Sequence, residues 1–334
     1  MGLFSNLSID IGIDLGTCNT LIYVRGRGIV CAEPSVVAVE RGTNQVVAVG
    51  EEAKRILGRT PSKIQAIRPL RDGVIAKLDL TEVMIKYFLD RTISSRRLVQ
   101  PRVVIGVPYC ITEVERKAVE DSATRAGVSK VECVYESLCA AIGADIPINE
   151  PAGHMVCDIG GGTTEVSVVS LGDLVVSNAI RIGGDEFDEA IVKHIRSVHN
   201  LTIGEQTAEA LKIKIGNAFP ESTIEKMEIK GTDAITGLPR RLEVDSVEIR
   251  EAIKDPVNII VEWIKRTFSD TPPELGADII DRGIVLTGGG AMLKGLSRLI
   301  AKETGVPVLL ANEPLLCVAI GAGRYHESNQ KKGY

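Results

Sequence analysis

The chain has 334 residues, of which 44% are hydrophobic and 25% charged, and its formal net charge is −5. This composition is typical of a soluble globular protein with room for two domains, and the acidic balance gives nucleic-acid binding no electrostatic support. The seven cysteines occur singly, and no apolar run approaches the roughly 18–20 residues of a membrane span, so the pattern favours reduced thiols in a cytosolic protein.

The first half of the chain opens with strands and then alternates strands with helices. Residues 9–49 have a β pattern with glycine-containing turns. The apolar spacing of residues 80–93 predicts a helix with Thr81 as its N-cap. A continuous apolar run at residues 103–107 then predicts a central strand that is covered on both faces.

A capping box marks the next helix, because Thr112 is followed three residues later by Glu115. We expect this helix to end at Gly127, since glycine is common just after a helix C-terminus. A short strand over residues 130–134 and a helix over residues 136–144 complete the first half.

The second half repeats this order of elements. Apolar strands over residues 155–159 and 164–170 open it, as a strand pair opens the first half. Strands joined by helical crossovers predict an α/β fold, and the hairpins that open each half predict mixed sheets flanked by helices. The other expected elements are helices over residues 186–199, 205–215 and 247–268, a hairpin within residues 223–244, and a strand over residues 284–287 that leads into a helix over residues 292–304.

Each half carries the same motif where its first strand ends. Asp14-Leu15-Gly16-Thr17 corresponds to Asp158-Ile159-Gly160-Gly161-Gly162-Thr163-Thr164. Glycine lets backbone N–H groups approach phosphate oxygens, threonine adds a hydroxyl donor, and each aspartate can hold the water shell of Mg²⁺. Taken alone, the first turn is more often structural, but a plain strand turn rarely needs three successive glycines. The pair predicts a duplicated domain with a polyphosphate clamped between the copies.

A third glycine loop, Gly288-Gly289-Gly290, follows a strand in the second half, and taken alone it fits a tight strand–helix connection. With the three loops in this order, the chain resembles the MreB-type bacterial actins, within the superfamily of actin, heat-shock chaperone and sugar-kinase ATPases. The resemblance extends over about residues 9–323. It is carried by the two Asp-Gly-Thr segments together with residues 28–30, 33–37, 66–75, 271–275 and 286–290.

The resemblance implies an actin-like ATPase fold with four subdomains around a central nucleotide cleft. The core of the first domain would comprise residues 1–31, 60–144 and 312–334, with residues 32–59 as a small insertion. The core of the second domain would comprise residues 145–180 and 246–311, with residues 181–245 as its insertion.

The same resemblance assigns binding roles to the glycine loops and to the helix of residues 205–215. The phosphates of ATP or ADP would lie between the first two loops, and Asp14 and Asp158 would hold Mg²⁺ through water. Cys18 stands where the family has alanine, and we interpret it as a small packing substitution. The expected nucleotide contacts are Gly16, Thr17, Cys18, Asn19, Gly160, Gly161, Gly162, Thr163, Glu209, Lys212, Gly288, Gly289, Gly290 and Ala291.

Glu136 is the expected hydrolytic carboxylate, and Thr163 is a second residue expected to position the attacking water. In the family this glutamate precedes a proline at the start of a helix, whereas Ser137 takes that place here. Because phosphoryl transfer depends mainly on positioning, a small shift of the helix start would slow hydrolysis without removing binding. The structural alternative for Glu136 is a charge at a helix N-terminus, which contributes only ~0.3–1 kcal/mol.

Two apolar segments are candidate membrane contacts by the same resemblance. Leu98 and Val99 follow two arginines in a loop, and Leu3 and Phe4 lie in a short N-terminal apolar segment. Burial of one apolar side chain contributes roughly 1.5–3 kcal/mol, so one subunit would bind weakly and a filament would bind through many copies. The alternative is that Leu98 and Val99 simply begin the following strand.

The resemblance therefore predicts a cytoplasmic bacterial actin, peripheral on the inner face of the cell membrane. It would form paired antiparallel filaments with itself, hydrolyse ATP slowly, and organise cell-wall synthesis with membrane-bound cell-shape proteins. The helix of residues 112–126 is the expected pairing surface, and its charged residues equally fit a solvated face. The alternatives are a filament protein with little or no turnover, and an actin-fold kinase or chaperone-type ATPase, for which no polyol-binding carboxylate motif or downstream substrate-binding domain is evident.

Overall fold

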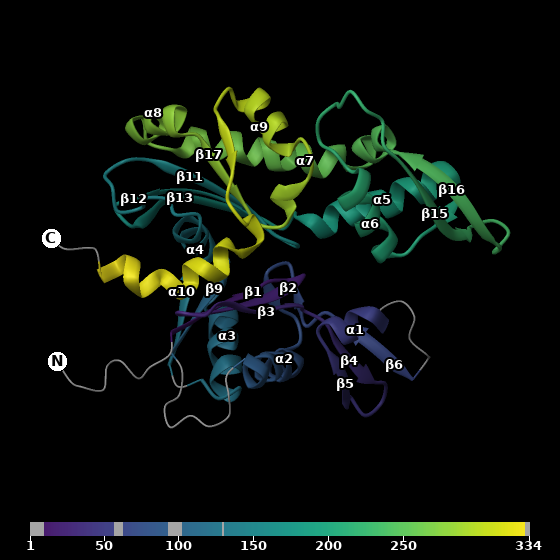
Figure 1. Cartoon of the computed structure of the whole chain (residues 1–334), viewed down its shortest axis with the longest axis horizontal. Helices are drawn as coiled ribbons and strands as arrows, with labels where there is room; N and C mark the ends of the chain where they lie inside the picture. The colour runs from purple at the N-terminus through teal and green to yellow at the C-terminus, as the bar shows by residue number, and fades with distance from the viewer. Residues whose placement is uncertain (1–9, 57–62, 93–101, 129, 331–334) are drawn as a thin grey trace.

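The computed structural model describes residues 10–56, 63–92, 102–128 and 130–330. Within these ranges two five-stranded sheets lie one above the other, each with helices packed against it (Figure 1). The lower sheet contains β1 (Asp10–Leu15), β2 (Asn19–Val24), β3 (Gly28–Pro34), β9 (Arg102–Val107) and β10 (Lys130–Tyr135). The upper sheet contains β11 (His154–Ile159), β12 (Thr164–Ser170), β13 (Asp173–Ile180), β17 (Ile284–Thr287) and β18 (Val308–Leu310).

The two sheets have the same topology. Their strand orders are β3-β2-β1-β9-β10 and β13-β12-β11-β17-β18. In each, the first strand is antiparallel to the second and parallel to a strand from later in the chain. The prediction of a duplicated α/β architecture with mixed sheets is therefore confirmed.

Helices cover the outer face of the lower sheet. In Figure 1, α2 (Leu78–Thr92) and α3 (Glu113–Arg125) lie beneath it. Phe88 of α2 and Val119 of α3 are buried in one apolar cluster with Ile13 of β1. The run of buried residues in β9 confirms the predicted central strand.

Two helices, α4 (Glu136–Gly143) and α10 (Cys317–Gln330), lie between the sheets (Figure 1). A separate buried cluster joins Leu138 of α4 to Val104 of the lower sheet and Val156 of the upper one. A side chain on Gly143 or Gly321 would collide with the backbone of the facing helix, so the two helices pack at backbone contact. This packing holds the middle and the end of α4, the helix that begins with Glu136.

Helices also cover the upper sheet. Residues of α7 and α9 share a buried cluster with β11 and β17. The helices of this half are α5 (Gly184–His199), α6 (Glu205–Ile215), α7 (Ser246–Asp270), α8 (Pro273–Arg282) and α9 (Leu296–Thr304). Two short 3₁₀ turns, η1 (Gly290–Met292) and η2 (Pro314–Leu316), accompany them.

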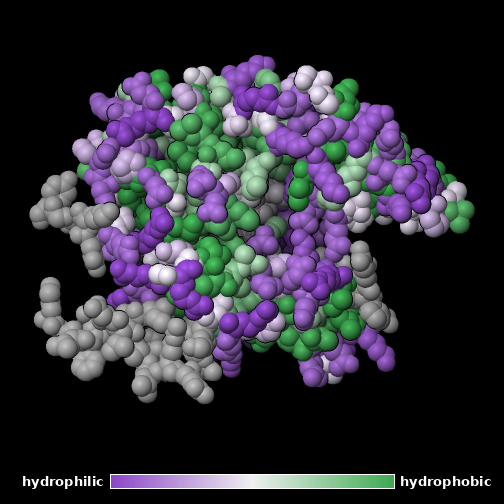
Figure 2. All heavy atoms as spheres, in the orientation of Figure 1, coloured by the Kyte–Doolittle hydropathy of each residue, from purple (hydrophilic) through white to green (hydrophobic). Residues whose placement is uncertain are grey.

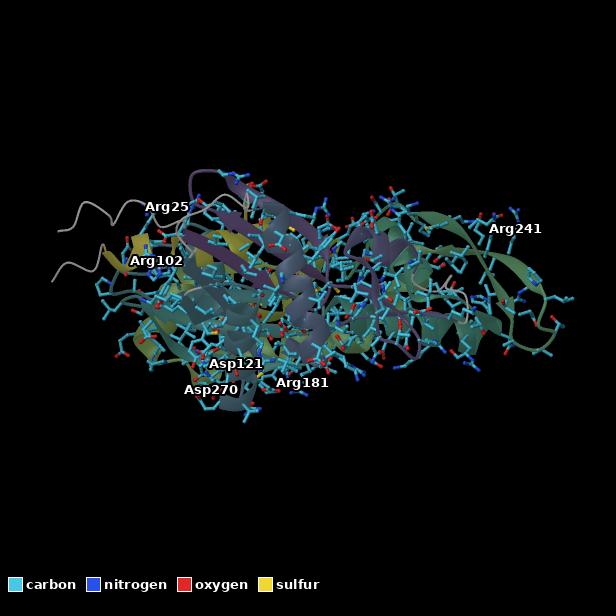
Figure 3. The ribbon with its side chains drawn as sticks, turned by 90° about the horizontal axis from the view of Figure 1, so that it is seen from below. Arg25, Arg102, Asp121, Arg181, Arg241 and Asp270 are labelled. Atoms are coloured by element: carbon cyan, nitrogen blue, oxygen red, sulfur yellow. The ribbon has the colours of Figure 1, made fainter. Side chains whose placement is uncertain are left out.

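Smaller units face each other at one end of the molecule, at the right in Figure 1. The lower unit contains β4 (Val37–Glu40), β5 (Val46–Val49), β6 (Ile64–Ile67) and α1 (Glu51–Ile56), and is followed by the short pair β7 (Leu70–Arg71) and β8 (Val74–Ile75). The upper unit contains α5 and α6 with β14 (Leu201–Thr202), β15 (Lys226–Asp233) and β16 (Pro239–Asp245). Figure 3 places Arg241 of β16 at this end, far from Arg25 and Arg102, which both pair with Asp10 at the start of β1.

Most expected helices and strands are present, and two boundaries were wrong. Thr81 is not the cap of α2, which begins at Leu78; the buried Thr81 hydroxyl instead donates to the Lys77 carbonyl at 2.9 Å. The helix expected from residue 292 begins only at Leu296, because Gly295 has a φ of 74°, which an α-helix does not accommodate. The capping box was right: Thr112 and Glu115 exchange both hydrogen bonds at the start of α3.

The predicted membrane contacts Leu3, Phe4, Leu98 and Val99 lie outside the described residues. Among the helices that are described, none combines the length and apolarity needed to cross a bilayer.

Candidate functional site

The three glycine loops meet between the two sheets. A side chain on Gly161 would collide with Cys18, and a Cβ on Gly162 would lie 3.1 Å from the Thr17 hydroxyl. The first two loops are therefore in contact across the two halves. A Cβ on Gly290 would meet Ile159, so the third loop lies against the end of β11. The structure thus brings together the segments that the sequence predicted to converge.

Neighbouring turns fix the conformations of these loops. The N-terminus of α5 packs on the second loop, where the Gly184 and Asp185 N–H groups donate to the Gly160 and Gly161 carbonyls at 3.0 and 2.8 Å. The Gly73 N–H donates to the Thr17 hydroxyl at 3.0 Å. Both halves therefore contribute to holding the predicted phosphate-binding turns in place.

Two carboxyl groups lie behind the loops, that of Asp14 half-buried and that of Asp158 buried. Burial, together with the charge of Asp158, raises the pKa of Asp14 to about 8. Burial raises the pKa of Asp158 to about 6, and a 2.6 Å hydrogen bond donated by the Thr287 hydroxyl limits that rise. A cation would relieve the repulsion between two such groups, and carboxylate oxygens with water are ligands that Mg²⁺ prefers. The donor set at this place fits the predicted hydrated Mg²⁺.

Glu136, the first residue of α4, belongs to the same acidic cluster. Its side chain is buried, and this burial, with the charges of Glu165, Asp14 and Asp158, raises its pKa well above the usual value. Thr163 is also buried, and its methyl group would lie 3.0 Å from a Cβ on Gly73. The structure therefore places the expected hydrolytic carboxylate beside the expected metal-binding aspartates.

The two predicted nucleoside contacts of α6 have protein partners. Lys212 donates to the Gly184 carbonyl and to Asp188, both at 2.8 Å. Glu209 forms an ion pair of 3.1 Å with Lys54 of α1, which belongs to the other half. Gly184, which Lys212 binds, donates to Gly160 of the second loop, and Glu209 lines one cavity with Thr17 of the first loop.

A cavity of about 440 Å³ lies where the two smaller units face each other. Thr17 and Glu209 line it together with Arg68 and Asp185, whereas the third glycine loop does not. Figure 2 shows the hydrophilic side chains that flank the opening between the upper and lower halves on this side. Thr17 therefore connects this cavity with the place where the glycine loops meet.

Sequence reasoning missed a residue that joins both phosphate loops. Asp185 accepts hydrogen bonds from Arg68 at 3.0 Å and from the Cys18 thiol at 3.2 Å, and its own N–H donates to Gly161. Burial and the nearby Asp185 charge raise the pKa of Cys18 to about 12, which supports the interpretation of this cysteine as a packing residue. Asp185 follows a Gly-Gly pair in the sequence, but no local pattern connects it to Arg68.

Comparison with known proteins identifies the family. The family model for the MreB/Mbl protein matches residues 8–333. The cell shape-determining protein Mbl of Bacillus cereus is 52% identical over 314 residues, which cover 94% of each chain. The cell shape-determining protein MreB of Escherichia coli is 48% identical over 328 residues, which cover 97% of this chain and 94% of that relative.

Solved structures support the same assignment. MreB5 of Spiroplasma citri bound to AMPPNP matches with a TM-score of 0.92 at 36% identity, over 97% of each chain. A MamK double helical filament matches with a TM-score of 0.82 at 23% identity, over 96% of this chain and 99% of that one, which shows the common fold. The predicted actin-like fold is confirmed, and the chain belongs to the MreB/Mbl family of cell shape-determining, actin-like bacterial proteins.

Proposed function

We propose that this protein binds Mg-ATP in the cleft between its two sheets, polymerises, and hydrolyses ATP slowly. The observation that carries the proposal is the contact between two equivalent glycine turns, one from each half, with the carboxyl groups of Asp14 and Asp158 behind them. Backbone N–H and hydroxyl donors on both sides suit a phosphate chain. The MreB5 relative has been solved with AMPPNP and with ADP, which supports the same ligand class here.

Each half contributes equivalent groups to this binding. Residues 16–19 and 160–163 would hold the phosphates, and Asp14 and Asp158 would hold the water shell of Mg²⁺, which supplies charge neutralisation when bound. Glu209 and Lys212 would contact the ribose and adenine, with the loop of residues 288–291 beneath the purine. This arrangement rests on the predicted division into two domain cores, residues 1–31, 60–144 and 312–334 against residues 145–180 and 246–311, with residues 32–59 and 181–245 as insertions.

Hydrolysis requires a group that orients water toward the terminal phosphate. Glu136 is proposed for this role, because its carboxylate lies beside both aspartates and can accept a hydrogen bond from water. Thr163, in the second glycine loop, would contribute its hydroxyl. Because a protonated carboxyl group is a weaker acceptor and cannot take up the proton of the water, the raised pKa of Glu136 predicts that turnover falls as the pH is lowered.

Filament formation is proposed from the family and from one exposed helix. The MamK relative has been solved as a double helical filament. On α3, Val114 is 80% exposed among charged residues, which suits a surface that another copy covers. We propose that α3 pairs antiparallel protofilaments, and that Leu3, Phe4, Leu98 and Val99 attach them to the inner membrane surface. There the protein would act with membrane-bound cell-shape and wall-synthesis proteins.

Electron microscopy and sedimentation with Mg-ATP, with and without anionic liposomes, test this proposal. We expect paired filaments with ATP, and their sedimentation with liposomes. The double variant Leu98→Asp, Val99→Asp should still form filaments, but these filaments should no longer sediment with liposomes. Absence of ATP-dependent sedimentation in the parent would refute polymerisation. Filaments that form without phosphate release would instead favour a filament protein with little or no turnover.

A further inference from the structure

The helix that begins with Glu136 lacks a cap from its own N-cap residue. Tyr135, which precedes Glu136, makes no capping hydrogen bond through its side chain. The first N–H groups of a helix have no partner within the helix and need acceptors from elsewhere. The start of α4 is buried, so the acceptor has to come from the protein.

Glu165, from the opposite half of the molecule, supplies that acceptor. The Ser137 hydroxyl donates to one Glu165 oxygen at 2.6 Å, and the Ser137 backbone N–H also bonds to this carboxylate. The Tyr109 N–H donates to the other oxygen at 2.5 Å. Both Glu165 and Ser137 are almost fully buried. A side chain of β12 therefore binds the start of α4 and the turn after β9 at the same time.

Tyr135, which precedes Glu136, is held by contacts within the lower half. The Tyr135 ring lies 5.1 Å from the Tyr109 ring, and the Arg116 guanidinium lies 5.4 Å from the Tyr135 centroid. Arg116 also donates to the Cys133 carbonyl at 3.1 Å. Glu136 thus stands between two residues that are each fixed, one by the lower half and one by Glu165.

We propose that Glu165 and Ser137 form a positioning pair that holds Glu136 in place for ATP hydrolysis. This inference rests on the proposed function and goes beyond it, because it assigns a role to residues outside the nucleotide contacts. A proline at position 137 would fix its own backbone angle but would lack both the N–H and the hydroxyl. In this chain the bonds to Glu165 provide the restraint that the ring would give. Hydrolysis should therefore depend on the pair, whereas nucleotide binding should not.

Steady-state ATP turnover of Ser137→Ala and Glu165→Gln tests the pair. Ser137→Ala removes the hydroxyl donor, and Glu165→Gln replaces one of two accepting oxygens by a donor. We expect kcat to fall on the order of 10- to 100-fold in each, since small displacements of a catalytic group have effects of this size. KM for ATP should stay at the parental value, because the lost interaction serves only the chemical step.

Ser167→Ala is the matched control. Ser167 lies on the same strand as Glu165, is equally buried, and shares a 2.7 Å hydrogen bond with Ser177. It should keep the parental kcat. The double variant Ser137→Ala, Glu165→Gln should be no slower than the slower single variant, because both changes break the same contact.

Three outcomes separate this inference from the function on which it rests. A parental kcat in Ser137→Ala would overturn the positioning pair. A rise in KM that matches the loss of kcat in both variants would also overturn it, since that pattern indicates general damage to the cleft. Glu136→Gln serves as the reference: if it turns over ATP at the parental rate, the proposed catalytic role itself fails, whatever the other variants do.

Discussion

Asp14 and Asp158 lie at the ends of equivalent strands, β1 and β11, in two sheets with the same strand order. The residues beside them on the neighbouring strands differ. On the parallel side, Asp14 pairs with Gly106 and Asp158 pairs with Thr287. Thr287 donates a hydroxyl to its aspartate. Gly106 has no side chain, and a Cβ there would lie 3.3 Å from Cγ of Glu136. The space that a threonine fills in the upper sheet thus accommodates the proposed hydrolytic glutamate in the lower one.

The antiparallel side shows a second difference. Asp14 pairs with Leu21, whereas Asp158 pairs with Glu165. The lower half presents an apolar residue, and the upper half presents the carboxylate that binds Ser137. The duplicated frame accounts for two equivalent phosphate turns. Glu136 and its partner Glu165 occur where the two copies differ.

Among changes that leave Glu136 itself in place, Gly106→Ala should have the largest effect, because the new side chain fills the space beside Asp14 that Glu136 occupies. The new Cβ would lie 2.8 Å from Cγ1 of Val318 as well as near Glu136. We expect a loss of ~1–3 kcal/mol in the free energy of unfolding and a fall in turnover on the order of 10- to 100-fold. Urea unfolding and phosphate release measure these effects. Gly276→Ala, in open space on α8, is the control: it should leave turnover unchanged and raise the free energy of unfolding by up to about 1 kcal/mol, because alanine is the better helix former.

In the upper sheet, Thr287→Val removes the hydroxyl that donates to Asp158 and keeps the shape of the side chain. At pH 7, above the Asp158 pKa of about 6, we expect the free energy of unfolding to fall by about 1.5 kcal/mol, as for lost hydrogen bonds to charged groups. At pH 5 the loss should be smaller, because the carboxyl group is then protonated. Equal losses at both pH values would contradict the assigned bond. Thr124→Val, on the surface of α3, provides the reference.

The two aspartates should also differ in their effect on pH dependence. A carboxyl group whose pKa is raised by folding stabilises the folded state at low pH, and this stability is lost as the pH rises through the folded-state pKa. Without nucleotide and Mg²⁺, the contribution of Asp14 to stability should therefore fall as the pH rises from 4 to about 8. Asp14→Asn should reduce the part of this fall above pH 6 by about 1 kcal/mol or more. An unchanged slope in urea unfolding between pH 6 and 8 would refute the raised Asp14 pKa.

Arg68→Ala should have the smallest effect. Its ion pair with Asp185 joins the two halves, but the two side chains are 30% and 25% exposed, so solvent screens the interaction. We expect the free energy of unfolding to fall by less than ~1 kcal/mol. Arg71→Ala removes a more exposed arginine nearby, on β7, and is the control. A loss several times larger than ~1 kcal/mol in Arg68→Ala would contradict this prediction. It would show that contacts between the halves stabilise the molecule as strongly as its buried apolar clusters.

Local patterns were sufficient to predict most of the fold. The alternation of apolar residues, the Thr112 capping box and the repeated strand–turn–strand units are properties of short segments, and all are present. The convergence of Asp14 and Asp158 followed from the duplication. The Thr81 boundary failed because a threonine hydroxyl also bonds well to the carbonyl four residues earlier within a helix.

The contacts between the halves could not be predicted in this way. Arg68 and Asp185 are 117 positions apart, and Ser137 and Glu165 are 28 positions apart on different elements. Neither pair has a spacing that a helix or strand period would reveal. The sequence shows the departure from the family at Ser137, but its partner Glu165 lies on β12, which only the fold brings beside the start of α4.

Phosphate release by Glu136→Gln filaments, compared with the parent at saturating Mg-ATP, tests the central claim most directly. That claim is that Glu136, in the space beside Gly106, orients water toward ATP held between the two turns. We expect ATP-dependent sedimentation to persist and phosphate release to slow by about 100-fold or more, since loss of a group that acts on the reacting water has effects of this order. Release at the parental rate would contradict the claim.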